Sequence, residues 1–361
     1  MLQASTTSTV PQPPRSFAGP QARSRSLNFV VFVAAILWYL CAQAISSSAA
    51  NVVGINFELG DWRPLLEAVL LLILLFYGLA LLRRIERRLA PLRVTLGIPR
   101  RATSRMEWAT GAAIGWGIAV ASVLPMALAR VLNTQLWTEP RAFMLFGISL
   151  VTLALLTLAH TLAIYGYGFQ RLIESIGPVR ATLVMVAVVS VVHSIVPAPY
   201  GTPDGTRILV DILMTLLLCL CWLRTHAVWL AWGLHFAWAA STGVLFGLPI
   251  AGQVSFGSVV DTRAMGPIWL TGGPYGPAAA ALTIMVLLAA IPILIRATSD
   301  FAWNYTHPPL IPGGYDVSVA PPPAHVAMEQ AAESALAVSP ASLVQIQTTT
   351  EQRPATESAS E

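Results

Sequence analysis

The chain of 361 residues is 55% hydrophobic and only 11% charged, whereas about 25% of the residues in an ordinary soluble protein are charged. This composition excludes a typical soluble globular protein and predicts a chain that lies mostly in a membrane. The net charge of +4 comes from 21 arginines without any lysine. Basic patches interleaved with aromatic residues are missing, so no nucleic-acid partner is expected and the charge is interpreted as the loop asymmetry of membrane proteins.

Eight apolar stretches are long enough for a membrane-spanning helix, which needs about 20 residues. They comprise residues 28–48, 64–82, 107–130, 142–168, 181–198, 207–223, 228–247 and 276–296. The first is longer than the apolar region of a typical signal peptide and follows 27 mainly polar residues, so it is interpreted as a span. The predicted fold class is an all-α integral membrane bundle of about eight transmembrane helices.

Most arginines lie in segments that eight crossings would put on one side of the membrane. They are Arg15, Arg23, Arg25, Arg83, Arg84, Arg87, Arg88, Arg93, Arg100, Arg101, Arg105, Arg171, Arg180, Arg224 and Arg296. The opposite loops hold little beyond Arg63, Arg141 and Arg263. Because cytoplasmic loops are enriched in basic residues, both termini are predicted to be cytoplasmic, in what we expect to be a bacterial inner membrane.

Two polar segments flank the predicted membrane domain of residues 28–298. Residues 1–27 are rich in Ser, Thr, Pro and Gln, and residues 299–361 contain "APPPAH" and "QTTTEQRPATESASE". Both are too polar and proline-rich to bury a core, so they are predicted to be disordered cytoplasmic tails. Three cysteines, Cys41, Cys219 and Cys221, lie in apolar segments, which argues against a disulfide framework or a cysteine-rich metal site.

Ionisable residues within the predicted spans are the most informative feature, because such groups are costly at membrane depth. His160, His193 and His235 lie on three different spans, and each is about 7 to 12 residues, or roughly 11 to 18 Å, from the predicted cytoplasmic end. The three histidines are therefore predicted to share one layer. The alternative is that each is a neutral imidazole bonded to its own helix surroundings. Asp211 is interpreted as an interfacial carboxylate reached by water.

Several stretches resemble one known family. They are "HTLAIYGYGFQRLIESIGP", "VVHSIVP", "LRTHAVWLAWGLHFAWAASTGVLFGLPIAG" and "WLTGGPYGP". Together they look like the membrane domain of the type II CAAX prenyl endopeptidases and their bacterial relatives, the CPBP or Abi group that includes lysostaphin resistance protein A. The resemblance covers about residues 100–296. It implies a helical intramembrane endopeptidase that acts on membrane-associated or lipidated peptides.

The first motif of that family, Glu-Glu-x-x-x-Arg-Gly, is altered in this chain. The resemblance aligns its glycine with Gly166 and its arginine with Tyr165. The paired glutamates then fall on His160 and Thr161. The polar residues of "HTLAIYGYGFQRL" therefore occupy positions that the family fills with carboxylates and an arginine.

The second and third motifs keep their histidines. The histidine of Phe-x-x-x-His aligns with His193, and Val189 stands where Phe is usual. The histidine of His-x-x-x-Asn aligns with His235, and Ala239 replaces the Asn. The resemblance thus implies catalytic positions at His160, His193 and His235.

These replacements predict that ordinary endopeptidase activity is lost or altered. In the family the first glutamate is taken to activate water with the second-motif histidine, while the third-motif His and Asn stabilise the oxyanion. A general base contributes roughly 10² to 10⁴ in rate, and one oxyanion donor roughly 10² to 10³. Ala239 cannot donate a hydrogen bond, and the Tyr165 hydroxyl can donate one but lacks the charge of arginine.

Two mechanisms could restore a nucleophile. His160, His193 and His235 could bind a divalent metal such as zinc, because three imidazoles and a water form a known catalytic geometry. Alternatively, His160 or His193 could act as the base for Thr161 or Ser194. Hydroxyl residues in membrane helices more often bond to their own backbone, which weighs against the second mechanism.

The competing class is a binding or scaffold protein without catalysis, whose cavity holds a membrane peptide, a prenylated tail or a partner protein. Gly233, Ala237 and Ser241 recur at four-residue spacing and would let another helix approach closely, although any bundle needs such a surface. A transporter is the least favoured class, because no internal repeat and no carboxylate relay are evident. Membrane lipid is an expected partner under every hypothesis.

Overall fold

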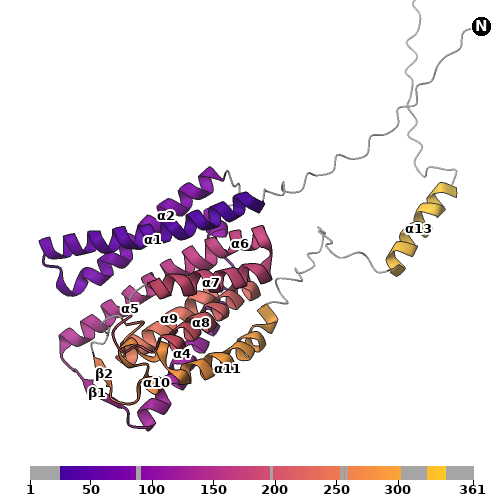
Figure 1. Cartoon of the computed structure of the whole chain (residues 1–361). Helices are drawn as coiled ribbons and strands as arrows, with labels where there is room; N and C mark the ends of the chain where they lie inside the picture. The colour runs from indigo at the N-terminus through magenta and orange to yellow at the C-terminus, as the bar shows by residue number, and fades with distance from the viewer. Residues whose placement is uncertain are drawn as a thin grey trace, which may run out of the picture. The chain divides into compact units, whose positions relative to one another are not determined.

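The computed structural model describes residues 25–86, 91–195, 198–252, 256, 259–301 and 323–338. The chain divides into two units, residues 1–307 and 308–361. The first contains a helical bundle and the second contains helix α13 (Pro323–Val338) (Figure 1). The predicted N-terminal tail lies outside the described residues except for its last three positions. Helix α13 lies within the predicted C-terminal tail, and its alanines, glutamates and glutamine favour helix.

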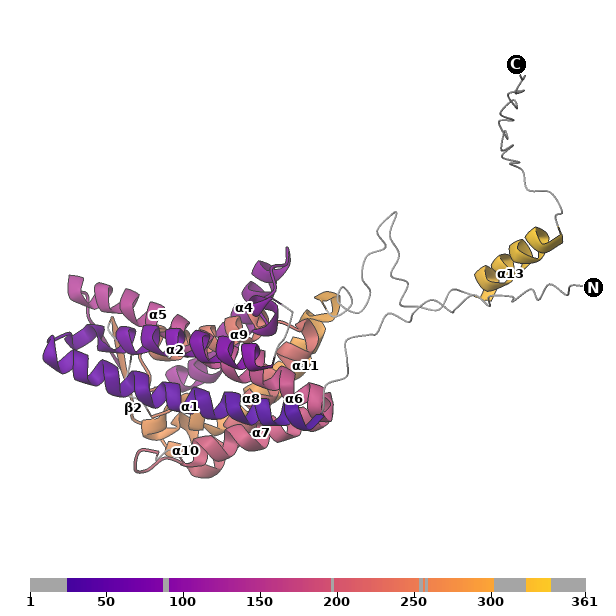
Figure 2. The ribbon, with the colours of Figure 1, turned by 90° about the horizontal axis from the view of Figure 1, so that it is seen from above.

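The bundle is built from helices and one small sheet (Figures 1 and 2). Its longer helices are α1 (Arg25–Asn56), α2 (Arg63–Ile85), α4 (Ser104–Leu128), α5 (Pro140–His160), α7 (Pro178–Ile195), α8 (Asp204–Thr225), α9 (Trp229–Ala240) and α11 (Ala281–Ala297). Shorter helices are η1 (Gly60–Trp62), α3 (Leu92–Thr95), η2 (Thr161–Gly168), α6 (Phe169–Ile176), η3 (Ser241–Leu245), α10 (Ile268–Thr271), η4 (Gly273–Tyr275) and η5 (Pro277–Ala279). The strands are β1 (Leu132–Leu136) and β2 (Val260–Ala264).

Six helices of the described residues are long and apolar enough to cross a membrane. They are α1, η1 with α2, α4, the continuous run α5–η2–α6, α7 and α8. Each coincides with one of the first six predicted spans. The last two predicted spans correspond to α9 with η3 and to α11, which is a shorter apolar helix of 17 residues.

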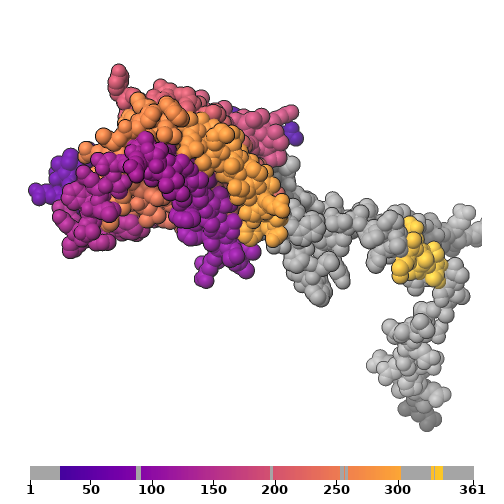
Figure 3. All heavy atoms as spheres, turned by 90° about the horizontal axis from the view of Figure 1, so that it is seen from below, coloured from indigo at the N-terminus to yellow at the C-terminus, as the bar shows by residue number. Residues whose placement is uncertain are grey.

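Large apolar side chains on the outer faces of these helices are exposed. Examples are Leu37, Ile45, Ile73, Leu81, Trp116, Leu124, Val151, Leu183 and Met285. Monomeric soluble proteins rarely expose apolar surface on this scale, whereas lipid covers it in a membrane protein. Helices α4 and α11 lie side by side on one such face (Figure 3). These features are those of a multi-pass membrane protein.

Strands β1 and β2 form a two-stranded antiparallel sheet, with Leu132 opposite Ala264 and Leu136 opposite Val260. The rest of the bundle is helical, in agreement with the predicted all-α fold class. The sheet could not be read from the sequence because its strands are five residues long and lie over a hundred residues apart. It joins the segment after α4 to the segment after η3, at the end opposite α6 (Figures 1 and 2).

Contacts between loops connect segments that the arginine distribution assigns to the same side of the membrane. On the predicted cytoplasmic side, Val228 N donates to Gly97 O at 2.8 Å, and Ser175 Oγ donates to Arg25 O at 2.8 Å. On the opposite side, Arg141 pairs with Asp61 at 2.6 Å, and the β1–β2 sheet forms. The helix ends therefore alternate between two ends of the bundle.

Helices α4 and α9 cross closely because glycines face each other at the crossing. A Cβ atom on Gly111 would overlap the carbonyl oxygen of Leu230, and one on Gly115 would overlap that of Leu234. From the other side, a Cβ on Gly233 would overlap the carbonyl oxygen of Trp108. The close approach predicted at Gly233 is thus made with α4, and it fixes the position of α9.

We expect Gly115→Ala to destabilise the bundle by about 1–3 kcal/mol, the usual cost of forcing an extra methyl group into a tight contact. Gly117→Ala on the same helix is the matched control, because its Cβ would have nothing within 4 Å. That change should be neutral or stabilise by up to about 1 kcal/mol through helix propensity. Thermal unfolding in detergent distinguishes them, and equal melting temperatures for the two variants would contradict the packing described.

Candidate functional site

A cavity of about 260 Å³ lies among α1, α2, α5, α7, α8 and α9. Its polar lining residues are Tyr39, Gln43, Glu67, Thr157, His160, Tyr165, His193, Asp211, Thr215 and His235. The structure thus brings the three predicted histidines to one cavity. Ile250, Ala251 and Ala278 also line it, so the cavity reaches the loops at the β1–β2 end. A larger cavity of about 400 Å³ beside the sheet is lined almost entirely by apolar groups.

The three histidines lie at different distances from the ends of their helices, although they line one cavity. The run α5–η2–α6 continues to Ile176, so His160 lies 16 residues from that end. His193 lies 15 residues from the start of α7 at Pro178. His235 is only six residues from the start of α9. The helix ends are set by local features, such as Gly177 with a positive φ of 83° after α6.

His160 and His235 form the inner part of the site. Their ring centroids are 5.0 Å apart with an interplanar angle of 69°. The His160 ring also packs edge-on against Tyr39 at 5.8 Å and Tyr165 at 5.7 Å. Within the described residues, Nδ1 of each histidine is buried without a hydrogen-bond partner. The alternative in which each histidine is satisfied by its own surroundings is therefore not supported.

His193 is paired with a carboxylate. Its Nδ1 lies 3.3 Å from Asp211 Oδ2, within ion-pair distance, although the two atoms are not aligned as a hydrogen bond. The His193 side chain is 41% exposed and that of Asp211 only 14%. Asp211, predicted to be a carboxylate reached by water, lines the cavity from α8. The site thus contains a carboxylate that the altered first motif lacks.

One face of α8 explains this position of Asp211. Arg207, Asp211 and Thr215 follow one another at four-residue spacing, which places them on the same side of a helix. Arg207 Nη1 donates to the carbonyl oxygen of His193 at 3.1 Å, and its guanidinium lies over the Tyr275 ring at 5.5 Å. Arg207 therefore anchors the end of α7 next to Asp211. The four-residue spacing indicates that the three residues share a face of α8, but it does not indicate that this face meets the cavity.

Two π-helical segments begin just after site residues. Segment η2 starts at Thr161, directly after His160, and all eight of its residues are buried. Segment η3 starts at Ser241, six residues after His235. Phe246 N donates to Ser241 O at 2.8 Å, the five-residue step of a π-turn. Such segments are rare and often occur at functional sites, because the widened turn changes the direction of neighbouring side chains.

Glycine permits the tight packing of η2. A Cβ on Gly166 would lie 2.5 Å from Leu96 O, in the loop that also bonds to Val228 through Gly97. A Cβ on Gly168 would lie 3.0 Å from the carbonyl oxygen of Ala163 within the π-turn itself. Gly166 and Gly168 therefore have a packing role here.

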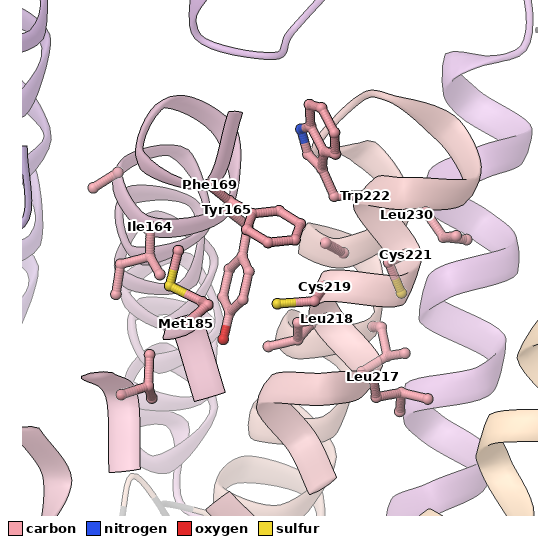
Figure 4. Packing of buried hydrophobic residues seen from close by; sticks show 14 of the residues in the cluster. Ile164, Tyr165, Phe169, Met185, Leu217, Leu218, Cys219, Cys221, Trp222 and Leu230 are labelled. Atoms are coloured by element: carbon pink, nitrogen blue, oxygen red, sulfur yellow. The ribbon is translucent and has the colours of Figure 1, made fainter. Parts of the chain in front are cut away.

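Residues at the altered motif positions have mainly structural contacts. Tyr165 lies in the core between Met185 of α7 and Cys219 of α8 (Figure 4). Ala239 lines the cavity with its methyl group only. Thr161 Oγ1 donates to the carbonyl oxygen of Thr157 at 2.6 Å.

The two hydroxyls proposed as nucleophiles are both bonded within their own helices. Besides Thr161, Ser194 Oγ donates to the carbonyl oxygen of Ser190 at 2.7 Å. Ser194 is exposed and does not line the cavity. The Ser or Thr nucleophile hypothesis therefore gains nothing from this arrangement.

A three-histidine metal centre is also not supported. The part of the chain that the structure describes contains no group of three or more His, Cys, Asp or Glu side chains that could hold a metal ion. His160 and His235 meet edge to face, and Nδ1 of His193 is directed at Asp211. The donor atoms of the three histidines thus do not converge on one point.

Helices α1 and α2 add residues to the cavity that sequence reasoning missed. Glu67 of α2 lines it, together with Tyr39 and Gln43 of α1. These residues precede the region of family resemblance. No local spacing indicates that they face the histidines, since only the packing of α1 and α2 against α5 brings them there.

A buried ionic cluster lies at the opposite end of α2. Arg171 is fully buried, and its Nε lies 3.3 Å from Glu86 Oε1 while its Nη1 lies 2.8 Å from Glu174. Tyr167 Oη donates to Glu86 Oε2 at 3.0 Å, and the Arg171 guanidinium lies over the Tyr167 ring at 4.9 Å. The cluster fastens α2 to η2 and α6, the run that carries His160.

Comparison with protein-family models, with curated proteins and with solved structures finds no match to this chain. The chemistry of the site therefore has to be argued from its own geometry.

Proposed function

We propose that the chain is a membrane-embedded hydrolase that cleaves an amide bond of a membrane-associated peptide, with His193 and Asp211 activating water. The observation that carries the proposal is the contact of 3.3 Å between His193 Nδ1 and Asp211 Oδ2 inside a cavity that also contains His160 and His235. A histidine held by a carboxylate is a common arrangement for a general base. The family resemblance supplies the substrate class.

The reaction follows from the positions of these groups. The negative charge of Asp211, 3.3 Å from His193 Nδ1, favours a proton on that nitrogen, which leaves Nε2 free to take a proton from water. The water oxygen attacks the peptide carbonyl carbon, and the negative charge moves to the carbonyl oxygen. His235 lies deeper in the cavity. In this proposal its ring N–H donates a hydrogen bond that stabilises the oxyanion. The protonated His193 then donates to the leaving nitrogen as the C–N bond breaks, which yields a carboxylate and an amine.

This mechanism differs from the one implied by the family. There the base is a glutamate at the position of His160, whereas here the carboxylate comes from α8 and acts through His193. His160 lies beside His235. Because Ala239 stands where the family has an Asn, the oxyanion has fewer hydrogen-bond donors. The proposed activity is therefore an altered form of the family reaction. It takes place in a bundle of eight crossings, with membrane lipid around it and a lipidated or unmodified membrane peptide as substrate.

We also propose that the chain crosses the membrane eight times. The two shortest crossings are α9 with η3 and α11. The alternation of loop contacts between the two ends supports them. We expect Arg141→Cys to react with a membrane-impermeant thiol reagent in intact cells and Arg93→Cys to react only after lysis. Both variants are made in a background in which Cys41, the exposed native cysteine, is replaced by Ser. Labelling of both positions from the same side would contradict the topology.

Incubation of purified full-length protein in lipid with a mixture of apolar membrane peptides tests the activity. Mass spectrometry should detect cleavage products that are lost in His193→Ala. The control is His226→Asn, since His226 lies between α8 and α9 outside the cavity, and Asn tolerates its left-handed conformation (φ 48°). Burial and the neighbouring Arg101 lower the pKa of His226.

The absence of cleavage with retained peptide binding would overturn the proposal in favour of the scaffold hypothesis. Products that persist in His193→Ala would contradict the assignment of His193 as the base.

A further inference from the structure

The cavity has a second acidic residue that the proposed reaction does not use. Glu67 of α2 lines the cavity beside Tyr39 and Gln43 of α1. These three residues belong to a part of the chain that precedes the region of family resemblance. Their position at the cavity therefore calls for an explanation of its own.

Glu67 carries a charge without a counter-ion. The charged side chains that line the cavity are Glu67 and Asp211, and no arginine is among the described lining residues. Asp211 faces His193, whereas Glu67 has no hydrogen bond or ion pair within the described residues. Arg63, one helical turn away on α2, instead donates to Asn51 Oδ1 at 3.2 Å.

A partly buried carboxylate in a membrane helix is costly unless a cation accompanies it. Two other residues that line the cavity, Tyr39 and Gln43, can also bind a cation. Tyr39 presents an aromatic ring, over which cations bind favourably, and Gln43 supplies an amide oxygen as an acceptor. The Tyr39 ring is 5.8 Å from that of His160, which connects this group to the inner part of the site.

We propose that Glu67, Tyr39 and Gln43 form a subsite for a cationic group, namely a Lys or Arg side chain of the peptide that enters the cavity. The inference rests on the proposed function only in taking a peptide as the ligand. The subsite sets which peptides bind and does not take part in the chemical step. It gives the chain a preference for peptides in which a basic residue lies within an otherwise apolar sequence.

Binding of two labelled peptides to the full-length protein in lipid nanodiscs tests this proposal. The peptides are identical and apolar except that one carries a lysine where the other carries norleucine, and both have an N-methylated amide at the central bond, which resists cleavage and carries no charge. Fluorescence anisotropy should give a dissociation constant about tenfold or more lower for the lysine peptide, the range of one charge-assisted contact. Glu67→Gln should remove most of that preference while leaving the norleucine peptide unaffected.

The matched control is Glu58→Gln, which removes the same charge from an exposed residue at the same end of the bundle and outside the cavity. It should keep the lysine preference. Equal binding of the two peptides by the wild type, an unchanged preference in Glu67→Gln, or no binding of either peptide would overturn the subsite. A lysine preference without any cleavage of natural peptides would leave the subsite standing and overturn the hydrolase instead.

Discussion

Asp211→Asn should lower kcat/KM for peptide cleavage by about 10² to 10⁴, the range of a positioned general base. The substitution keeps the size of the side chain and removes the charge that faces His193 Nδ1 at 3.3 Å. Without that charge the imidazolium formed in the transition state is not stabilised, and the wrong nitrogen can carry the proton. Steady-state kinetics of the purified variant measure the loss, which should fall mainly on kcat.

The control for this change is Asp61→Asn, because Asp61 is an exposed acidic residue paired with Arg141 near the same end of the bundle. Its loss should leave kcat/KM within about twofold, since exposed ion pairs contribute little. The double variant His193→Ala with Asp211→Asn should be no slower than His193→Ala alone, because the two residues act as one unit. Additive losses would mean that Asp211 acts on something other than His193.

Glu86→Ala should destabilise the bundle by about 3–5 kcal/mol, the usual cost of removing one partner from a buried ion pair. Glu86 contacts the fully buried Arg171 at 3.3 Å and accepts a hydrogen bond from Tyr167 at 3.0 Å. Its removal leaves the Arg171 charge without its buried partner. Thermal unfolding in detergent, followed by circular dichroism, should show a large fall in melting temperature.

Two further variants separate the ion pair from ordinary packing. Glu174→Ala removes the other partner of Arg171, but that carboxylate is 31% exposed, so the cost should be no more than about 1 kcal/mol. Replacing both Glu86 and Arg171 by Met should recover most of the stability lost in Glu86→Ala, because no fully buried unpaired charge then remains and the Glu174 carboxylate is partly exposed. A Glu86→Ala variant as stable as the wild type would show that the cluster does not hold α2 against η2.

The helices and the histidines could be predicted because both depend on local pattern. Apolar stretches identified the six long helices, and the cost of burying ionisable groups singled out His160, His193 and His235. The last two predicted spans, residues 228–247 and 276–296, correspond to shorter helices. Helix α9 continues only through the π-segment η3, and α11 has 17 residues, so length alone does not establish that they cross the membrane.

The acidic residues of the site could not be predicted because they depend on tertiary packing. Asp211 lies two turns from the start of α8, which suggested an interfacial position. Only the contact of α7 with α8, anchored by Arg207 on the carbonyl of His193, turns it towards the cavity. Glu67 lies on a helix that precedes the region of family resemblance. The π-segments were also missed, because a π-turn and an α-turn share the same apolar sequence pattern.

The most direct test of the central claim is cleavage of a membrane peptide in water enriched in heavy oxygen, with wild type and Asp211→Asn compared in the same lipid. The site is proposed to activate water through His193 and Asp211. Mass spectrometry should therefore find one heavy oxygen atom in the new carboxylate of the wild-type product, formed at a rate that Asp211→Asn reduces by about 10² or more. Product without heavy oxygen, or labelled product formed equally fast by Asp211→Asn, would contradict the account.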